Sequence, residues 1–290
     1  MIHFESVTKR FAAATALSDL SFVLPKGGVA GLLGPNGCGK TTALRLLLGL
    51  YLPDQGRVQV FGTPPNSQSS DRIGYLPEER GLYRRMTTTE VIRYYARLKN
   101  SRASPSEIDG WLDRLGISEF ADQKVESLSK GTAQKVQFVA TVVHRPQLLI
   151  LDEPFSGLDP VSRELMRQAV LTLAGDGTTV LLSTHDMEIA SRMCDTILML
   201  NDGRKVLDGS LSEIFASFAD DSIKIELDGA VPDLTGVLEV LDLGTVQELV
   251  LDAGVDPTDV LRELMSQTKL RRFELSTPSL GDIFLRMAKS

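Results

Sequence analysis

LSKGTAQKVQFVATVVHRPQLLILDEPFSGLDP, residues Leu128–Pro160, packs three distinctive segments into one predicted helix, one strand and a turn. LSKGT stands at the start of a predicted helix. The apolar run LLIL is typical of a buried strand, and it ends in two adjacent acids, Asp152 and Glu153. A tight turn, SGLD, follows. The stretch therefore predicts an α/β fold with polar groups at the carboxyl end of a central strand.

A second segment, GPNGCGKT at Gly34–Thr41, matches the pattern G-x-x-x-x-G-K-[ST]. It lies between an apolar run, Gly28–Leu33, and a helical run, so the strand–loop–helix context of a phosphate-binding loop is present. We expect Lys40 to bridge the β- and γ-phosphates of a nucleotide and the Thr41 hydroxyl to ligate Mg²⁺. The alternative is a glycine-rich turn that only caps a helix. The Cys38 thiol is expected to pack in the loop or face the nucleotide, with a redox switch as the alternative.

The paired acids predict hydrolytic chemistry when they are combined with this loop. Asp152 can hold Mg²⁺ through water, and Glu153 can orient or deprotonate an attacking water. Two adjacent carboxylates repel each other, so a nearby cation explains their pairing. In isolation the same letters would equally describe a solvated acidic turn.

Composition narrows the class of protein. The chain has 290 residues, 42% of them hydrophobic and 24% charged, which is typical of a globular protein with one large and one small domain. Its formal net charge of −7 disfavours a nucleic-acid-coating surface. No apolar run approaches the roughly 20 residues of a membrane span, and the N-terminus lacks a signal-peptide core. We therefore expect a cytoplasmic protein whose membrane role would come through a partner chain.

The order of elements predicts a parallel, doubly wound sheet, because strands alternate with helices after the loop. We predict a turn at Thr15–Asp19 and a polar loop at Asn66–Ser70. Predicted strands are Ile2–Val7, Ser21–Leu24, Gly28–Leu33, Arg57–Phe61, Thr178–Ser183 and Ile197–Leu200. Predicted helices follow the loop and cover Glu90–Asn100, Pro105–Gly116 (with Ser104 as its cap), Arg163–Ala174 and Met187–Met193.

The pattern changes beyond a boundary near Phe215–Asp221, where alternating strands replace the long apolar runs. This C-terminal region resembles a small β-α-β-β-α-β layer. Its predicted strands are Ser222–Leu227, Leu238–Leu241, Gln247–Leu251 and Arg272–Leu275, and its helices are Pro257–Ser266 and Leu280–Ala288.

Together these motifs resemble the ATP-binding subunit of an ABC transporter over Met1–Phe215. The resemblance implies a P-loop NTPase cassette at 1–215, with a RecA-like parallel core, an antiparallel β subdomain and a helical insert at about 83–140. A small α+β accessory domain at 221–290 would follow. It also implies ATP and Mg²⁺ as cofactors and ATP hydrolysis as the reaction.

LSKGT resembles the family's signature sequence, usually LSGGQ, and departs from it at Lys130 and Thr132. The phosphate-contacting positions, Ser129 and Gly131, are retained. Taken alone, the segment would more often be a plain helix cap. In the family, two subunits pair head to tail, and the signature of one covers the ATP held by the other.

Further site residues come from the same resemblance. Asp159 of SGLDP is implied at the dimer seam, and His185 of STHD at the γ-phosphate. Phe11 is implied to stack on adenine, with a core Phe as the alternative. Glu78 replaces the usual glutamine after IGYLP, and we expect it to be an Mg²⁺ or water ligand. The implied nucleotide-binding residues of the loop are Gly34, Pro35, Asn36, Gly37, Cys38, Gly39, Lys40, Thr41 and Thr42.

YLPEERGLY and the later PSLGDIF, Pro278–Phe284, resemble a narrower group of sodium-export type. The resemblance implies a separate transmembrane permease that docks on EERGLYRRM and the helix after it. It also implies a homodimer, or a dimer with a related ATPase subunit, at the inner face of the cell membrane, and no nucleic-acid partner. We expect the C-terminal region to be a packing or dimer-supporting module.

Two other functions remain open at this point. One is a soluble ABC-type ATPase that acts on ribosomes or nucleic acid, although those proteins usually carry two cassettes or long coiled coils. The other is a nucleotide-dependent regulatory switch, which the intact acids and His185 disfavour. Sodium, a drug-like compound and a peptide all stay possible as the transported substrate.

Overall fold

The computed structural model describes residues 1–12, 14–79, 81–218, 222–227, 229–242, 244–252, 254–275 and 278–289. It divides into two compact units, Met1–Leu211 and Ser212–Lys289. The expected bounds 221 and 290 of the C-terminal domain lie outside the described residues. Among the described residues, no helix has the length and apolar character that a membrane crossing requires.

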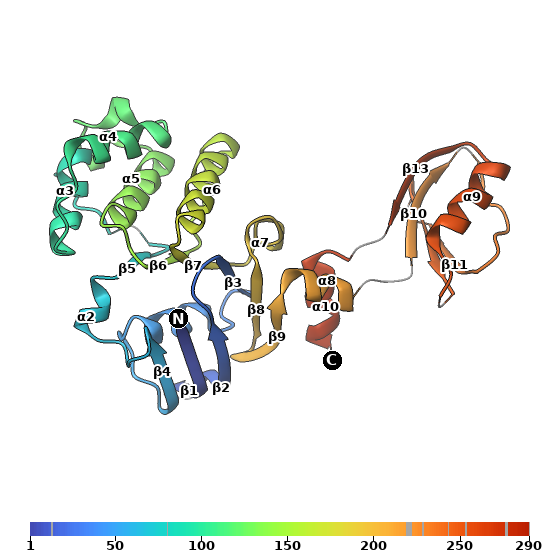
Figure 1. Ribbon diagram of the computed structural model, residues 1–290, viewed down its shortest axis with the longest axis horizontal. Coiled ribbons are helices and arrows are strands. Elements are labelled where there is room, and N and C mark those ends of the chain that lie inside the picture. The colour runs from blue at the N-terminus through green and yellow to red at the C-terminus, as the bar shows by residue number, and fades with distance from the viewer. Residues whose placement is uncertain are drawn as a thin grey trace. The chain divides into compact units, whose positions relative to one another are not determined.

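The centre of the first unit is a six-stranded sheet of order β5-β6-β7-β3-β8-β9 (Figure 1). Five of its strands run parallel and the sixth, β9, pairs antiparallel to β8 at the edge. Every residue of β3, β6 and β7 is buried, as expected for strands covered on both faces. The predicted parallel α/β core is confirmed. Its strands are β3 (Val29–Leu33), β5 (Ile73–Leu76), β6 (Leu148–Asp152), β7 (Thr179–Thr184), β8 (Thr196–Asn201) and β9 (Arg204–Ser210).

A second, antiparallel sheet of order β2-β1-β4 consists of β1 (Ile2–Phe11), β2 (Ala14–Leu24) and β4 (Gln55–Val60). The predicted turn at Thr15–Asp19 is wrong, because these residues belong to β2. Thr15 pairs with Arg10, and Leu17 pairs with Lys9. The strand continues through these residues because Leu17 and Leu20 are fully buried in the core. Register shifts along β1 keep the two strands paired although the pairing is not regular.

The predicted loop at Asn66–Ser70 is also wrong in part, because α2 (Ser67–Ser70) forms there. The Asn66 side chain accepts a hydrogen bond from the Ser69 backbone N–H at 2.9 Å, and the Ser69 hydroxyl accepts one from the Asn66 N–H at 3.0 Å. This reciprocal cap stabilises a single helical turn in a segment whose polar composition suggests only a loop.

The helical part of the first unit contains α3 (Thr88–Leu98), α4 (Pro105–Arg114) and α5 (Lys130–Val142), which Figure 1 shows grouped together. The N-terminus of α4 is as predicted: the Ser104 hydroxyl accepts from the Glu107 N–H, and Pro105 is the first helical residue. Two short 3-10 helices, Ser118–Phe120 and Val125–Ser127, connect α4 to α5. The other helices of the first unit include α1 (Lys40–Leu47), α6 (Pro160–Gly175) and α7 (Met187–Met193), while α8 (Leu211–Ser217) begins at its end and lies mostly in the second unit.

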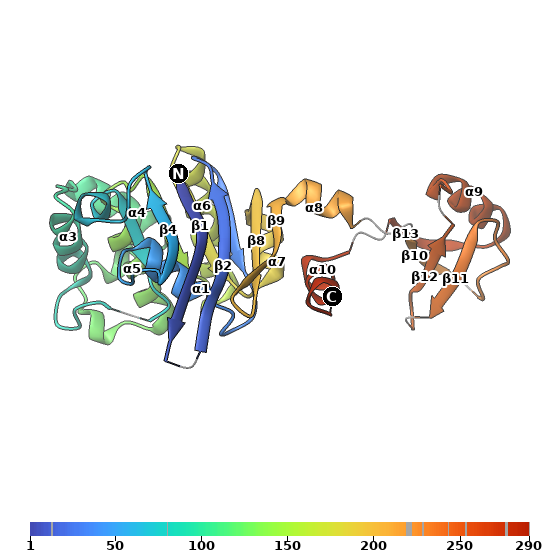
Figure 2. The same cartoon turned by 90° about the horizontal axis from the view of Figure 1, so that it is seen from below.

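The second unit contains an antiparallel sheet of order β11-β12-β10-β13 (Figure 2). After α8, its element order is β-β-β-α-β-α, so the predicted strands and helices occur in the expected order along the chain, but the predicted resemblance to a β-α-β-β-α-β layer is wrong. Only a short segment with Pro232 and two glycines, Gly229 and Gly236, separates the first two strands, which leaves no room for a helix. The elements are β10 (Ser222–Leu227), β11 (Val237–Asp242), β12 (Gln247–Leu251), α9 (Pro257–Gln267), β13 (Leu270–Leu275) and α10 (Leu280–Lys289).

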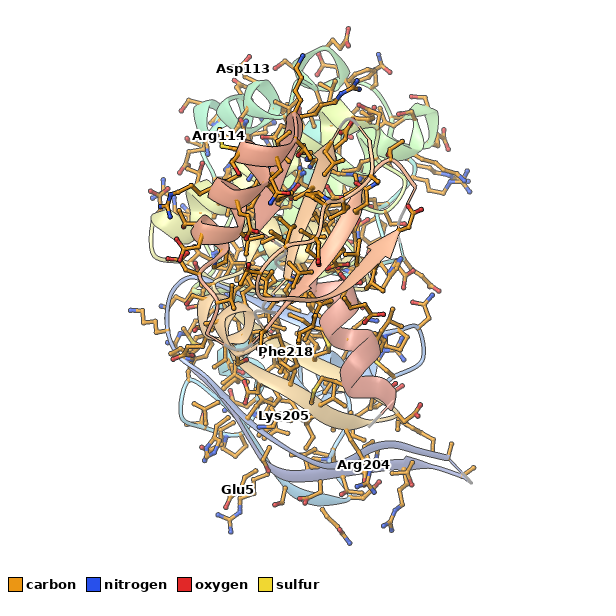
Figure 3. All side chains as sticks on the ribbon, turned by 90° about the vertical axis from the view of Figure 1, so that its right-hand side faces the viewer. Glu5, Asp113, Arg114, Arg204, Lys205 and Phe218 are labelled. Atoms are coloured by element: carbon orange, nitrogen blue, oxygen red, sulfur yellow. The ribbon has the colours of Figure 1, made fainter. Side chains whose placement is uncertain are left out.

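Each unit has its own hydrophobic core. In the second unit, Ile223 and Ile225 of β10 pack with Leu249 of β12 and with Val260 and Leu264 of α9. Charged side chains such as Asp113 and Arg114 of α4, and Arg204 and Lys205 of β9, are exposed at the surface (Figure 3).

Candidate functional site

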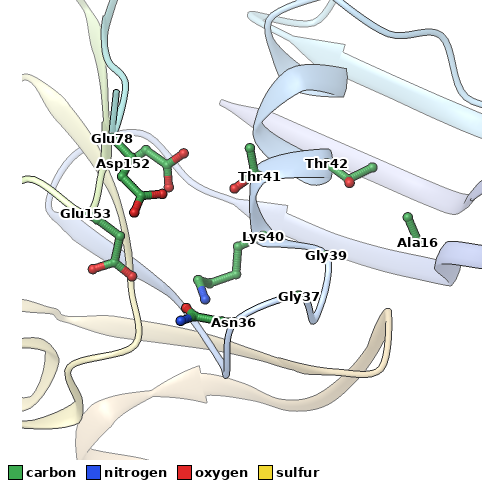
Figure 4. A pocket seen from close by; sticks show the side chains of 10 residues that line it. All are labelled: Ala16, Asn36, Gly37, Gly39, Lys40, Thr41, Thr42, Glu78, Asp152 and Glu153. Carbon is green, nitrogen blue, oxygen red and sulfur yellow. The ribbon is translucent and has the colours of Figure 1, made fainter. Parts of the chain in front are cut away.

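A cavity of about 280 Å³ lies where three loops leave the carboxyl ends of β3, β5 and β6 (Figure 4). This edge is where open α/β sheets bind ligands, because loops from neighbouring strands converge there. The cavity brings together the glycine-rich loop, the loop after β5 and the paired acids after β6. Its lining residues are Ala16, Asn36, Gly37, Gly39, Lys40, Thr41, Thr42, Glu78, Asp152 and Glu153.

The glycine-rich loop has a backbone that only glycine can follow at two positions. Gly34 has a φ of 143°, and a Cβ there would lie 2.2 Å from the Leu200 carbonyl oxygen. Gly39 has a φ of 109°, and its Cβ would lie 2.6 Å from the Ala16 carbonyl oxygen. Both neighbours are backbone atoms, which cannot move aside cheaply. The loop is therefore wrapped closely onto β2 and β8, as a phosphate-binding loop requires.

Lys40 is folded back across this loop. Its Nζ donates hydrogen bonds to the carbonyl oxygens of Gly34, at 2.7 Å, and of Pro35, at 3.1 Å, and the side chain is buried. Lys40 also begins α1, so its charge lies beside the partial positive charge of a helix N-terminus. Both features favour an anion at this end of the cavity.

We expect Gly34→Ala to abolish ATP binding by deforming the loop, because the new methyl group overlaps the Leu200 carbonyl and L-residues are strained at this φ. The measurement is nucleotide affinity by calorimetry, together with the melting temperature. Gly37→Ala is the comparison: Gly37 also has a positive φ, 81°, but nothing lies within 4 Å of its Cβ. Equal losses in both variants would contradict the steric explanation.

Asp152 is only 3% exposed, and it accepts a hydrogen bond from the Ser183 hydroxyl at 2.8 Å. Burial, the largest cause, raises the pKa of Asp152 above its ordinary value, and the neighbouring Glu78 and Glu153 carboxylates raise it further. The Ser183 hydroxyl and the Lys40 ammonium act in the opposite direction. Crowded negative charge of this kind is relieved by a cation.

The cavity's donors fit Mg²⁺. The Thr41 hydroxyl, Asp152 and Glu78 could supply oxygen ligands from different sides of the cavity, and nucleotide phosphates could supply the rest (Figure 4). Within the part of the chain that the structure describes, no three His, Cys, Asp or Glu side chains converge as a metal cage. Mg²⁺ commonly uses one or two carboxylates together with phosphates and waters, so a full protein cage is not needed.

We expect Ser183→Ala to move the acidic limb of the pH–rate profile for ATP hydrolysis to higher pH. The Ser183 hydrogen bond lowers the pKa of Asp152, so its removal raises that pKa, and a higher pH is then needed to give the carboxylate. Hydrolysis rates measured from pH 5 to 9 at saturating ATP and magnesium test this. Ser191→Ala, on the nearby surface of α7, serves as the control. A limb that stays in place would contradict the assigned contact.

Glu153 and His185 are held together by a set of hydrogen bonds. Oε1 of Glu153 accepts from the His185 backbone N–H at 2.9 Å and lies 2.7 Å from Nδ1 of its ring. Oε2 accepts from the Thr184 hydroxyl at 3.1 Å. The Glu153 backbone has a φ of 49°, a left-handed conformation, and its N–H donates to the Ser183 carbonyl oxygen at 2.9 Å.

Sequence reasoning missed the positioning contacts of Ser183 and Thr184, although it singled out the segment STHD that contains them. The missing signal was the strand register: Asp152 of β6 pairs with Ser183 of β7 in the parallel ladder, so the two strand ends are neighbours. Ala16 of β2 was also missed as a lining residue.

Several residues implied at the nucleotide are not among those that line this cavity. Gly34, Pro35 and Cys38 do not line the cavity. Cys38 packs in the core at 3% exposure, and burial raises the pKa of its thiol, so the thiol stays protonated. Phe11 is 40% exposed and contacts Tyr51 edge-on, with ring centroids 5.2 Å apart.

Ser129, Gly131 and Asp159 also lie outside the cavity. The exposed Ser129 begins α5, where its hydroxyl accepts from the Thr132 N–H at 3.1 Å. Asp159 begins α6 and accepts from the Ser162 N–H at 2.9 Å, a contact that lowers the pKa of Asp159. Within one chain Ser129 and Asp159 therefore act as helix caps, and Gly131 lies in the first turn of α5.

Residues 17–156 match the family described as "ABC transporter", and residues 209–288 match "ATP-binding protein DrrA1-3-like, C-terminal domain". The uncharacterized ABC transporter ATP-binding protein YhaQ of Bacillus subtilis is 40% identical over 98% of this chain and 97% of its own length. The Nod factor export ATP-binding protein I of Sinorhizobium fredii is 34% identical over 99% of this chain and 85% of its own length.

Solved structures agree with these matches. The dimeric structure of MJ0796, a bacterial ABC transporter cassette, superposes with a TM-score of 0.67 at 25% identity, over 73% of this chain and 99% of that one. The fold expected from the sequence motifs is thereby confirmed for the first unit.

Proposed function

Because the chain belongs to the ATP-binding proteins of ABC transporters, we propose that residues 34–42, Glu78 and the acids at 152–153 form its MgATP site. The chain is an ATP-hydrolysing subunit of an ATP-driven transporter, since the family couples ATP hydrolysis to transport through a separate membrane permease. The observation that carries the site assignment is the single cavity shared by Lys40, Asp152 and Glu153.

Each part of this cavity has a proposed task. Loop N–H groups and Lys40 hold the β- and γ-phosphates, and Asp152 with Thr41 and Glu78 would hold Mg²⁺. When bound, Mg²⁺ supplies positive charge beside the phosphates. Glu153 orients and deprotonates the attacking water, while His185 keeps the Glu153 carboxylate in position and contacts the γ-phosphate.

The second half of the site is proposed to come from a partner subunit. Ser129 caps the N-terminus of α5, whose first turn contains Gly131, and Asp159 caps the N-terminus of α6; none of them lines the cavity of its own chain. The N-terminus of α5 offers N–H donors and a favourable dipole for a phosphate. A head-to-tail dimer would bring this N-terminus over the ATP of the other chain, with Phe11 beside the adenine.

We propose further that the transporter is an exporter. The support is the name of the Nod factor export relative and the DrrA-like match of the C-terminal region. The permease would dock on the segment after Glu78 and on α3, which would place the chain at the inner face of the membrane. The comparisons give no support to an action on ribosomes or nucleic acid.

Metal removal tests the site assignment. We expect chelation of Mg²⁺ to lower ATP hydrolysis by about 10³-fold or more, because phosphate charge is then left without its counter-ion. Phosphate release is measured with and without EDTA, and Mg²⁺ is then titrated back. Asp152→Asn should raise the Mg²⁺ concentration needed for half-maximal rate. Hydrolysis that persists in EDTA, or an unchanged Mg²⁺ requirement in this variant, would refute the assignment.

A further inference from the structure

The four-stranded sheet of the second unit has an open edge at β11. Among the described residues, β11 pairs on one side only, with β12, and Figure 2 shows it at this edge. The pairing is regular from Glu239 to Asp242, since the register shift lies before Glu239. Edge strands have backbone N–H and C=O groups that can pair with another chain. β11 therefore offers an unpaired backbone edge to an incoming strand.

The apolar side chains of β11 are largely exposed. Leu238 is 66% exposed, Val240 45% and Leu241 37%. The buried core of this unit comes mainly from β10, β12 and α9, and among the described residues of β11 only the partly buried Val237 packs against it. Neighbouring exposed apolar side chains mark interaction surfaces. Within the described part of the chain, β11 is therefore uncovered in both its backbone and its side chains.

The two faces of β11 differ in chemistry. Val240 lies opposite the buried Leu249, and Leu241 lies opposite Glu248. Directly opposite residues point to the same face of a sheet, and successive residues point to opposite faces. Val240 is therefore on the core face, while Leu241 and Glu239 are on the outer face with Glu248. A strand added at this edge would meet apolar surface on one face and acidic side chains on the other.

The sequence around this edge contains acidic residues and no basic ones. From residue 225 to residue 261 there is no Lys, Arg or His. The same stretch contains nine acids, which are Glu226, Asp228, Asp233, Glu239, Asp242, Glu248, Asp252, Asp256 and Asp259. Positive charge on an incoming segment would be attracted here, and negative charge would be repelled. An occupant with Lys or Arg on its polar face therefore complements the edge.

A second copy of the chain complements β11 less well. Pairing of β11 with β11 would bring together the acids of two identical strands, including Glu239 and Asp242. The other edge strand, β13, contains Arg271 and Arg272 and could pair with β11 of another copy. Such a head-to-tail contact leaves a free edge at each end, so it adds further copies without closing. A separate basic segment satisfies the edge and ends there.

We propose that β11 binds an extended, basic segment of the permease as a fifth strand of this sheet. Apolar side chains of the segment would lie beside Val240, and its Lys or Arg side chains would lie beside Glu239. The permease is a suitable source because the cytoplasmic loops of membrane proteins carry an excess of Lys and Arg. This source rests on the proposed function, whereas the basic, extended character of the segment rests on β11 itself. The contact is additional to the docking of the permease on α3.

A short peptide of alternating lysine and valine is the probe, because it matches both faces of the edge. Its binding to the full-length chain is measured by fluorescence anisotropy, and we expect a dissociation constant of about 0.1 mM or lower at low salt. An alternating glutamate–valine peptide should not bind. A lysine–proline peptide has the same charge but lacks the N–H donors at proline, so it should bind at least about tenfold more weakly. Added salt should weaken the binding of the lysine–valine peptide.

Hydrogen exchange and two variants locate the bound peptide. The lysine–valine peptide should protect Val237–Asp242 from exchange and leave Leu270–Leu275 of β13 unchanged. Leu241→Lys places positive charge at the edge and should weaken binding about tenfold or more. Leu275→Lys is the control, because Leu275 is a 56% exposed leucine on the other edge strand. ATP hydrolysis should be unchanged in both variants, because neither residue lines the ATP cavity.

The possible outcomes separate this proposal from its alternatives. Absent binding, equal binding of the lysine–proline peptide, or equal loss in the two variants would overturn it. If ATP hydrolysis is intact in that case, the proposed function still stands. Protection of β11 and β13 together as the chain is concentrated, without peptide, would assign the edge to a second copy. In the complex with the permease, β11 should be protected without added peptide, and a β11 that exchanges freely there would overturn the permease as occupant.

Discussion

Glu153→Gln is expected to lower the rate of ATP hydrolysis by about 10²–10⁴-fold, the usual contribution of a general base. The amide keeps the size of the side chain, and the Thr184 hydroxyl can still donate to its remaining oxygen, so the fold should persist. ATP binding should be retained because Lys40 and the loop N–H groups are untouched. Phosphate release and nucleotide affinity are the measurements.

The same variant should accumulate as an ATP-bound dimer, which size-exclusion chromatography with and without ATP would detect. Glu188→Gln is the matched control, since Glu188 is an exposed acid on α7 that does not line the ATP cavity. Undiminished hydrolysis in Glu153→Gln, or an equal loss in the control, would remove Glu153 from its assigned role.

A mixture of two inactive variants is expected to recover hydrolysis. Lys40→Ala damages the phosphate loop, and Ser129→Glu places a negative charge where the proposed partner phosphate lies. Each homodimer should lose about 99% of its activity, since both of its sites are damaged. In a heterodimer, both lesions fall in one composite site and the other site is intact. Random mixing should therefore recover roughly a quarter of the wild-type rate.

The control mixture combines Lys40→Ala with Glu153→Gln. Both residues line the cavity of their own chain, so a heterodimer has one lesion in each site and should stay inactive. Hydrolysis is measured as a function of mixing ratio in both experiments. Recovery in the control mixture, or none with Ser129→Glu, would contradict the assignment of Ser129 to the partner's ATP.

The features that the sequence predicted well are local ones. The phosphate loop, its strand and its helix are contiguous, and their spacing alone specifies the turn. The start of α4 was readable for the same reason, since Ser104, Pro105 and Glu107 are neighbours along the chain. Buried runs such as LLIL also identified the central strands without ambiguity.

The errors concern contacts between segments distant in sequence. Leu17 looked like part of a turn, but its pairing with β1 and its burial in the core make Thr15–Asp19 a strand. The Ser183 contact with Asp152 spans 31 residues and depends on the register of β6 and β7, which spacing does not encode. In the second unit the predicted strands and helices are present, but the β-α-β-β-α-β layer predicted from them is not, because the same elements can pair in more than one arrangement.

The left-handed backbone at Glu153 has an evolutionary consequence. A residue with a side chain pays about 1 kcal/mol or more for such a φ, and glycine would adopt it freely. Mutations that relieve this backbone strain therefore tend to replace the carboxylate at this position. Descendants that abandoned turnover and kept only nucleotide binding should readily exchange this acid for glycine or asparagine, so its identity records whether selection for hydrolysis has been maintained.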